Sequence, residues 1–481
     1  MKIKVHKVFD NEWCSQSGKF LLLAFLLIGQ CLIAQKKPNI VFILSDDAGY
    51  ADFGFQGSKE FKTPRLDALA KESIQCTQAY VSAAVCGPSR AGFLTGLYQQ
   101  RFGFEENNVP GYMSASGATG DDMGLPLNQR TIANELHEQG YATAIFGKWH
   151  MGNADRFHPT KRGFDEFYGF RGGARSFMPY DENNPIDKDE NRLERGFGNF
   201  LEHDGYLTDD LADKTNQFIV QHKDRPFFVY LSFNAVHTPM QANKTDLDQF
   251  PDLRGKRKTL AAMTLAMDRA CGKVVDQLEK LNLLENTIIV FTNDNGGPSD
   301  SNSSLNKPLS GTKANHLEGG IRVPFLISWK GNLQKNITFY HPISLLDMYP
   351  TFSVVAGVEQ HKLKHLDGVD LLPFFKNEKE GRPHEVLYWK KENRGVIREF
   401  DWKLIRYPDR PAELYDISKD IAEQYDLALQ YPDKVKAMYK KLFQWELGLE
   451  RPKWQLQRKF EGKAAQRMDQ YSAKKITINK E

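Results

Sequence analysis

Short runs of apolar and β-branched residues alternate with helix-like segments through most of the chain. Runs of this length are typical of strands that are buried on both faces of a sheet. Strands are expected at residues 39–45, 141–147, 227–233, 287–292 and 323–329. Helices are expected between them at residues 63–73, 131–140 and 258–281. This alternation predicts an α/β fold with a large, mostly parallel sheet sandwiched by helices.

The pattern changes after about residue 355. Short strand-like pieces and then a helical pattern follow, at residues 385–390, 395–407, 412–417 and 431–447. We therefore expect a main domain over residues 35–355 and a smaller C-terminal α+β subdomain of antiparallel sheet and helix over residues 356–450. Residues 451–481 are polar and rich in Lys and Arg, which indicates a solvated tail.

The first residues have the pattern of an export signal. Lysines precede an apolar run of ten residues, and cleavage is expected after Ala34. The run is about half of the roughly 20 residues needed to span a bilayer, so no transmembrane span is expected. We predict a secreted or periplasmic protein that loses residues 1–34. A lipid anchor on Cys31 is the alternative, which Gln30 disfavours because a small residue should precede a lipidated cysteine.

Composition narrows the possible partners. The 64 Lys and Arg residues nearly balance the 61 Asp and Glu residues, so the chain lacks the global field that attracts nucleic acid. Removal of the export signal leaves three cysteines, Cys76, Cys86 and Cys271. An odd number is not a disulfide framework, and at least one thiol is expected to be unpaired.

Polar clusters follow four of the predicted strands, where sheets of this kind place their functional groups. Asp46 and Asp47 follow the first strand, and Asp294 and Asn295 follow the strand at 287–292. Three carboxylates and one amide are hard oxygen ligands, which suit Ca²⁺, or less well Mg²⁺, rather than zinc. Each pair alone could be a helix cap or a turn. Their joint position at strand ends predicts a metal site.

Cationic side chains are expected at the same edge of the sheet. Lys148 and His150 alternate along the extended segment GKWHMG, so both can point to one face. His237 lies just beyond the strand at 227–233, and Lys313 lies in a glycine-rich loop. Each residue alone would usually be structural or solvated. Together they would form a cationic cup for a tetrahedral dianion.

Cys86 stands in the sequence VCGPSR, two residues before Pro88, which is a favourable first residue of a helix. Cys86 would then lie just ahead of the positive helix end. From the residues alone, this predicts a thiolate with a lowered pKa that acts as a nucleophile. A thiolate beside a hard divalent cation is nevertheless a poor chemical match.

The block Cys86-Gly87-Pro88-Ser89-Arg90 is similar to the signature of the type I, formylglycine-dependent sulfatases of the alkaline-phosphatase-like superfamily. Other blocks with family counterparts stand in the same order, among them PNIVFILSDD, GKWHMG, FNAVHTP, FTNDNGG and EGGIRVPF. The resemblance covers nearly the whole chain after residue 34 and includes bacterial polysaccharide sulfatases. It implies a sulfatase fold and a sulfuric ester hydrolase activity.

The resemblance also implies a modification and a metal. A formylglycine-generating, or sulfatase-maturing, enzyme would oxidise Cys86 to formylglycine (3-oxoalanine), whose aldehyde hydrates to a geminal diol. A diol oxygen is a proper ligand for Ca²⁺, which removes the conflict with a thiolate. In the family pattern, the ion is held by the group at position 86 and by Asp46, Asp47, Asp294 and Asn295.

Family analogy assigns the remaining roles. One diol oxygen would attack sulfur, and the sugar oxygen would leave on the opposite side. Arg90 and Lys148 would hold the formylglycine oxygens. Lys313 and His237 would contact the sulfate and stabilise or protonate the leaving oxygen. His150 would take a proton from the remaining hydroxyl, which expels sulfate and restores the aldehyde.

A sulfated polysaccharide or its oligosaccharides is the expected substrate, because the export signal combines with a resemblance to carbohydrate sulfatases. Ulvan, carrageenan, fucoidan and animal glycosaminoglycans all remain open. Loops at 101–125 and 170–205 are expected near the substrate. Their candidate residues, together with one from the Lys313 loop, are Arg101, Glu105, Tyr112, Arg171, Arg175 and His316. Solvated surface charge is the alternative for each arginine.

Two alternative functions stay open. The superfamily includes phosphodiesterases and phosphonate monoester hydrolases, and fold alone does not decide the reaction. A non-catalytic protein that binds sulfated glycans is the other alternative. The Cys-x-Pro-Ser-Arg block and the Asp/Asn-only metal set favour sulfate esters, and every catalytic position that can be matched is filled.

Overall fold

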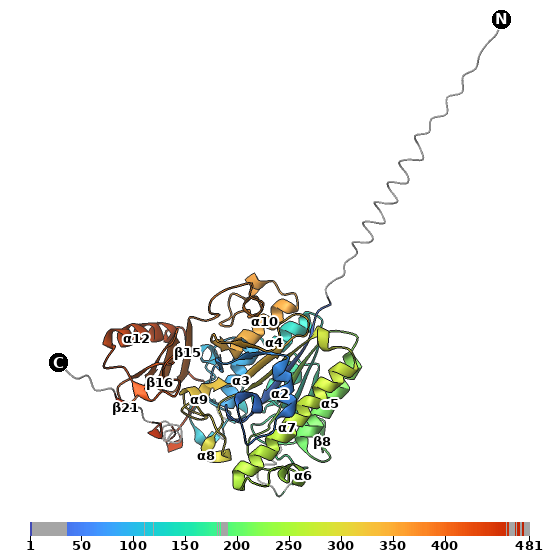
Figure 1. Ribbon diagram of the computed structural model, residues 1–481, viewed down its shortest axis with the longest axis horizontal. Helices are drawn as coiled ribbons and strands as arrows, with labels where there is room; N and C mark the ends of the chain where they lie inside the picture. Colours follow the sequence, from blue (N-terminus) through green and yellow to red (C-terminus); the bar gives the residue numbers. More distant parts are fainter. Residues whose placement is uncertain are drawn as a thin grey trace. The chain divides into compact units, whose positions relative to one another are not determined.

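A computed structural model gives the fold of the chain (Figure 1). It describes Met1 and residues 36–109, 111–118, 120–179, 181, 183, 191–457, 459–460, 467, 469–471 and 474–475. The predicted export signal lies, apart from Met1, outside the described residues. Pro38–Glu481 forms one compact unit. Among the described helices, none combines the length and the apolar character needed to cross a membrane.

Five parallel strands form the centre of a ten-stranded sheet. Their order is β10 (Thr287–Asn293), β1 (Asn39–Ser45), β9 (Phe227–Ser232), β5 (Ala142–Lys148) and β6 (Glu166–Phe170). Beyond β10 lie β12 (Phe325–Ser328), β2 (Ile74–Cys76) and β13 (Ile337–Phe339), and beyond β6 lie β7 (Leu193–Arg195) and β8 (Phe200–Leu201). The α/β fold is confirmed. The strand predicted at 323–329 is an exception to its parallel centre, because β12 runs antiparallel to β10.

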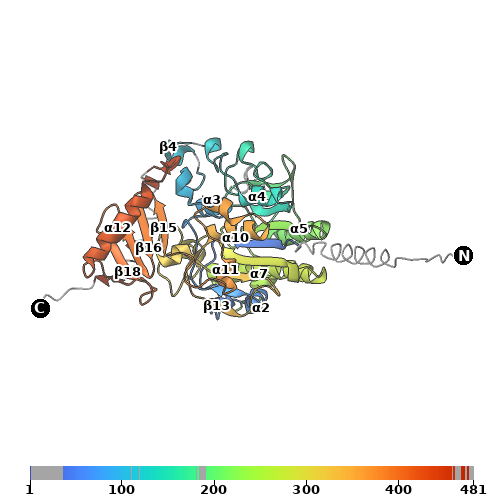
Figure 2. The same ribbon diagram turned by 90° about the horizontal axis from the view of Figure 1, so that it is seen from above.

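Both faces of the central strands are covered, as their continuous apolar sequences predict. All seven residues of β1 are buried. Phe42 stacks on Phe93 at a centroid distance of 4.1 Å on one face, and Val41 and Ile43 belong to the core of the other face. The first face is covered by α3 (Cys86–Thr95), α4 (Ile132–Glu138) and α10 (Met348–Val355), and the second by α2 (Pro64–Lys71), α5 (Leu207–His222) and α7 (Gly255–Lys280) (Figures 1 and 2).

The C-terminal part contains the predicted antiparallel sheet and helix, seen together in Figure 2. The elements are β15 (Val386–Lys391), β16 (Arg394–Glu399), β17 (Trp402–Arg406), β18 (Glu413–Asp416) and α12 (Pro432–Glu446). Leu404 on one face of the sheet packs with Leu442 of α12, and Trp389 on the other face belongs to the main core. The small sheet therefore shares its core with the large one. The domain boundary near residue 355 stays a prediction.

The start of the polar C-terminal segment differs from the solvated tail that its composition predicts. Trp454–Leu456 forms β20, which pairs antiparallel with β4 (Ser114–Gly117). The Trp454 side chain is buried and donates its indole N–H to the carbonyl oxygen of Asn107. The strand pairing and the buried Trp454 hold this stretch against the rest of the protein, and a count of charged residues does not reveal them.

Candidate active site

Four neighbouring strands bring the predicted site residues to one edge of the sheet. In the order β10, β1, β9 and β5, the carboxyl ends are followed by Asp294 and Asn295, by Asp46 and Asp47, by His237, and by Lys148 and His150. Since these strands are parallel, their carboxyl ends meet at the same edge. Cys86 and Arg90 come from the start of α3, and Lys313 comes from a loop.

Three buried carboxylates and one thiol gather at this edge. One oxygen each of Asp46, Asp47 and Asp294 and the Sγ of Cys86 all lie within 4.8 Å of one another. Burial and the negative charge of Asp46 raise the pKa of Asp294 to about 6. This shift is the electrostatic cost of placing carboxylates together away from water, and a bound cation would remove it.

Asn295 completes a set of oxygen ligands. Its Nδ2 donates to Oδ1 of Asp47 at 2.7 Å. Its own Oδ1 is buried and has no hydrogen-bond partner among the described residues. A buried amide oxygen without a donor is costly unless something else satisfies it. The four residues Asp46, Asp47, Asp294 and Asn295 thus fit a hard divalent cation.

Cys86 is the first residue of α3, with Val85 as its extended N-cap. The helix begins two residues earlier than Pro88 predicts. The Sγ atom lies 3.5 Å from Oδ1 of Asp46 and 3.0 Å from Nζ of Lys313. Burial, reinforced by Asp46, raises the pKa of the Cys86 thiol. The expected lowering of this pKa is therefore wrong, because burial and a carboxylate outweigh the helix end and the lysine.

Arg90 and Lys148 neutralise the carboxylates from the side of α3 and β5. The Arg90 guanidinium donates to Oδ2 of Asp294 at 2.9 and 3.0 Å and lies 3.4 Å from Oδ2 of Asp46. Lys148 Nζ donates to Asp46 at 2.5 Å. All four side chains are shielded from solvent. Buried charges of this kind are stable only when each one has a partner, which fixes their geometry.

Lys313 reaches the same cluster from its loop. Its Nζ lies 2.7 Å from Oδ1 of Asp47 as well as 3.0 Å from the thiol of Cys86. Burial alone would lower the pKa of Lys313, but the charge of Asp47 outweighs it and raises the pKa. The reverse holds for Asp47, whose pKa is lowered because Lys313 and His237 outweigh burial. Lys313 is therefore a fixed cation beside residue 86.

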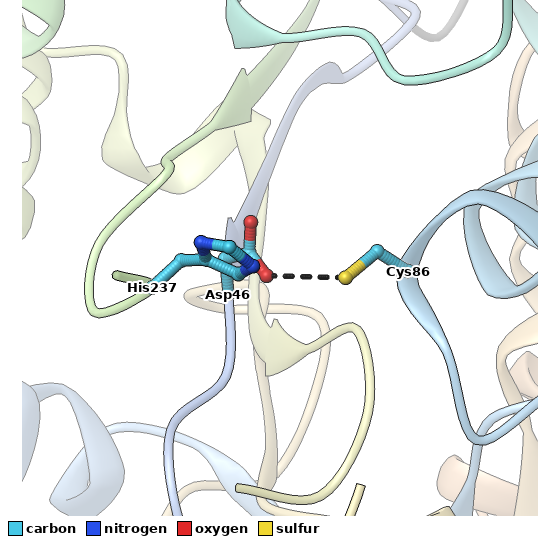
Figure 3. A group of neighbouring side chains, drawn as sticks. All are labelled: Asp46, Cys86 and His237. Carbon is cyan, nitrogen blue, oxygen red and sulfur yellow. Dashed lines mark hydrogen bonds between the residues drawn. The ribbon is translucent and has the colours of Figure 1, made fainter. Parts of the chain in front are cut away.

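His237 lies close to Asp46 and Cys86, as Figure 3 shows. Its Nδ1 pairs with the carbonyl oxygen of Thr238 at 2.7 Å, and its Nε2 lies 3.5 Å from Oδ2 of Asp47. A neutral ring that donates from Nδ1 to a carbonyl leaves Nε2 as the free acceptor toward the site. Burial lowers the pKa of His237 to about 4. The ring is thus held neutral, with Nε2 on the side of Asp47.

His150 is placed by its backbone and by a glycine. Its φ is 61°, in the left-handed region that costs a non-glycine residue roughly 1–3 kcal/mol. Its N–H donates to the carbonyl oxygen of Arg171 at 3.0 Å. A Cβ on Gly173 would lie 2.5 Å from Nε2 of the ring. Burial and the charge of Lys148 hold the pKa of His150 well below its usual value.

The residues expected to contact substrate from loops 101–125 and 170–205 have mostly internal partners. Arg171 makes two hydrogen bonds to Glu194 at 2.7 and 2.8 Å, and Arg101 makes two to Asp367 at 2.7 Å. Arg175 is buried and donates to the carbonyl oxygen of Asn191 at 2.6 Å. These arginines contact the protein's own chain, so plain solvation does not describe them, and their contact with substrate stays a prediction.

The other three candidates differ among themselves. Glu105 pairs with Lys390 at 2.8 Å, and His316 is 1% exposed. Tyr112 is 69% exposed and meets Phe460 edge to face, with the centroids 6.0 Å apart. Of these three, only Tyr112 presents its side chain to solvent. The sequence could not separate them, because burial depends on distant segments.

A cavity of 270 Å³ opens beside His237 and Lys313. Its walls include residues that the sequence did not single out, contributed by the loop at 106–107, by the β15–β16 hairpin and by the C-terminal segment. They are Glu106, Asn107, Lys391, Glu392, Leu456, Phe460 and Arg467. No local pattern marks them, since they meet only in the folded chain.

Comparisons with known proteins agree with this arrangement. Residues 38–358 match the model of the Sulfatase family. N-acetylgalactosamine-6-sulfatase of Mus musculus is 31% identical over 395 residues, which cover 78% of this chain and 73% of that protein. The solved structure of Ps i-CgsB in complex with k-i-k-neocarrahexaose has a TM-score of 0.81 and 36% identity, and the match covers 91% of this chain and 100% of that chain.

A phosphonate monoester hydrolase of Agrobacterium radiobacter is a more distant neighbour. Its TM-score is 0.61 at 18% identity, over 85% of this chain and 95% of that chain, which shows a shared fold only. The family match spans most of the chain and includes the Cys86 block and all four strand ends that carry site residues. The chain therefore belongs to the sulfatase family, within the type I sulfatases of the alkaline-phosphatase-like superfamily, and is a sulfuric ester hydrolase.

Proposed function

We propose that the protein is an exported, calcium-dependent sulfatase that removes sulfate from carrageenan oligosaccharides through a formylglycine made from Cys86. The observation that carries the proposal is the position of Cys86 between the carboxylate cluster and Lys313, with Sγ 3.5 Å from Asp46 and 3.0 Å from Lys313. A thiol whose pKa is raised there is a poor nucleophile. Conversion to an aldehyde gives the same position an oxygen nucleophile.

The ligand set supports calcium. Asp46, Asp47, Asp294 and Asn295 would hold the ion together with an oxygen of residue 86, and the unpaired Oδ1 of Asn295 supports this assignment. Hydrated formylglycine would supply the nucleophilic oxygen, and the bound cation would lower its pKa and polarise the sulfate.

The surrounding side chains have the geometry for the remaining steps. Arg90 and Lys148, fixed on Asp46 and Asp294, would hold the oxygens of residue 86. Lys313 would stabilise charge on the sulfate and the leaving oxygen. His237 is neutral in the resting site, and a bound sulfate dianion would favour a proton on its Nε2, which it would then give to the leaving oxygen.

His150 would act last. A neutral ring, which its lowered pKa favours, can take the proton from the remaining hydroxyl of residue 86, expel sulfate and restore the aldehyde. The role requires an available ring nitrogen, and Nδ1 of His150 is buried without a hydrogen-bond partner among the described residues.

The substrate is proposed from the neighbour that shares 36% identity and whose structure contains a neocarrahexaose. Carrageenan is one of the polymers that the sequence left open. Because some relatives are N-acetylgalactosamine-6-sulfatases, glycosaminoglycan oligosaccharides should be tested beside carrageenan oligosaccharides. Sulfate release should be measured for both classes with one enzyme preparation. Release from glycosaminoglycans alone would overturn the carrageenan proposal and keep the sulfatase.

Mass spectrometry of the peptide that contains Cys86 tests the nucleophile. Native material should show a loss of about 18 Da, from replacement of the thiol and one hydrogen by a carbonyl oxygen. Cys86→Ser should fold but fail to turn over, because a serine sulfate ester has no second hydroxyl to expel sulfate. An unmodified thiol in protein without sulfatase activity would instead favour a glycan-binding protein. Hydrolysis of phosphonate esters that is faster than hydrolysis of sulfate esters would favour the phosphonate monoester hydrolase.

Export is proposed from the N-terminal pattern. Purified mature protein should begin at Gln35, which N-terminal sequencing would show. A mature chain that begins at an acylated Cys31 would replace secretion by a lipid anchor.

A further inference from the structure

The C-terminal segment reaches the active-site cavity. Leu456, Phe460 and Arg467 line the same 270 Å³ cavity as His237 and Lys313. Arg467 lies 154 residues after Lys313 in the chain, so the contact arises only from the fold. Its residue exposure is 8%, which is low for an arginine in a segment of polar composition.

Arg467 makes contacts on two sides. Its Nε and Nη2 donate to the carboxylate of Asp300 at 3.1 and 2.8 Å. Its Nη1 donates to the backbone carbonyl oxygen of Lys313 at 3.0 Å. A planar guanidinium held by two bonds to a carboxylate points its third donor in a fixed direction. The backbone carbonyl oxygen of Lys313 accepts the hydrogen bond from this third donor.

The two partners belong to chain segments that carry proposed metal ligands and a proposed catalytic group. Asp300 lies on α8 (Ser299–Asn302), a few residues after Asp294 and Asn295. Lys313 holds Nζ 2.7 Å from Asp47 and 3.0 Å from Cys86. Arg467 therefore ties the end of the metal-ligand loop to the peptide unit from which the Lys313 side chain starts.

We propose that Arg467 is a positioning residue, which fixes where Lys313 places its ammonium group beside residue 86. This role rests on the proposed sulfatase chemistry of Lys313. Other bonds hold the same loop: the Thr312 hydroxyl donates to the carbonyl oxygen of Gly297 at 2.7 Å, and the Ala314 N–H donates to that of Ala84 at 2.8 Å. Loss of Arg467 should thus displace Lys313 without unfolding the loop, and reduce turnover rather than abolish it.

The test compares Arg467→Gln, Arg467→Lys and the control Arg410→Gln. Arg410 pairs with Asp469 of the same C-terminal segment at 2.8 Å but does not line the cavity. With a carrageenan oligosaccharide, R467Q should lower kcat about tenfold and change KM by less than about twofold, because the lost interaction is one that Lys313 makes in the transition state. R467K should be intermediate, since a lysine keeps the charge but not the fork geometry.

A second readout does not depend on turnover. Lys313 should react several-fold faster with an N-hydroxysuccinimide ester in R467Q than in wild type or R410Q, as followed by mass spectrometry of its peptide. Asp300→Asn, which weakens the same contact from the other side, should act in the same direction if R467Q does not fold. Wild-type labelling of Lys313 in the folded variants would overturn the role of Arg467. If the wild-type enzyme releases no sulfate but Lys313 is labelled faster in R467Q than in wild type, the proposed function is overturned and the role of Arg467 is kept.

Discussion

Replacing Gly173 by alanine tests whether the position of His150 limits turnover. An added Cβ would lie 2.5 Å from Nε2 and 2.7 Å from Cε1 of the His150 ring. Ordinary contact needs about 3.5 Å, so the ring must move by about 1 Å. Gly173 does not have a left-handed φ, and the substitution adds no backbone strain there. The effect should come through the histidine.

A displacement of about 1 Å in a catalytic group can cost about 100-fold in rate. That factor corresponds to about 2.7 kcal/mol in the activation free energy. We therefore expect Gly173→Ala to lower kcat about 100-fold. Overpacking should reduce the free energy of unfolding by about 1–3 kcal/mol, so the variant should still unfold cooperatively.

The assay is sulfate release at saturating substrate, with urea unfolding as the check on stability. Gly448→Ala is the matched control, because its Cβ would meet its nearest atoms at 3.5 and 3.6 Å. In a His150→Ala background, Gly173→Ala should have no further effect on kcat, since the ring that it displaces is gone. Full activity of folded Gly173→Ala, or an undiminished additional loss in the double variant, would refute the reasoning.

Three further outcomes are expected. Lys403→Met should lower the free energy of unfolding by about 3–5 kcal/mol, because Lys403 lies 2.9 and 2.8 Å from the fully buried Glu318 and Glu423. Urea unfolding measures this change, and an unchanged urea midpoint would contradict it. Burial disfavours ionisation of Glu194, but His158 and Arg171 outweigh burial and lower the pKa of Glu194 from 4.5 to about 2. Ionised Glu194 therefore stabilises the fold above about pH 4.5, and this contribution disappears as the pH falls toward 2. Glu194→Gln should flatten that part of the stability curve, and an identical curve would refute the assignment. Chelation with EGTA should abolish sulfate release and lower Tm, and Ca²⁺ should restore both more fully than Mg²⁺. A Tm that does not change on addition of EGTA would contradict a bound ion in the purified protein.

Much of the fold could be predicted from local pattern. The five buried runs identify β1, β5, β9, β10 and β12 within a residue or two, because apolar length and β-branched composition are local properties. The antiparallel direction of β12 could not be predicted, because direction depends on where the connecting chain crosses the sheet. The start of α3 at Cys86 instead of Pro88 is a further small error, and the first turn also makes a non-local contact, because the Gly87 N–H donates to the Asn107 side chain at 2.8 Å.

The sequence by itself determined which chemistry the strand ends can carry. Carboxylates, an amide, two histidines and Lys148 stand at the strand ends, and the resemblance of the block around Cys86 to the sulfatase signature indicated their roles. Parallel strands require their carboxyl ends to meet. Only the tertiary structure decided how each group behaves. Burial turned the expected thiolate of Cys86 into a thiol with a raised pKa. The fold also pairs Arg171 with Glu194 in an ion pair and places Arg467 within hydrogen-bond distance of the Lys313 carbonyl oxygen. These contacts join residues far apart in sequence, and desolvation depends on all neighbours at once, so no local pattern encodes them.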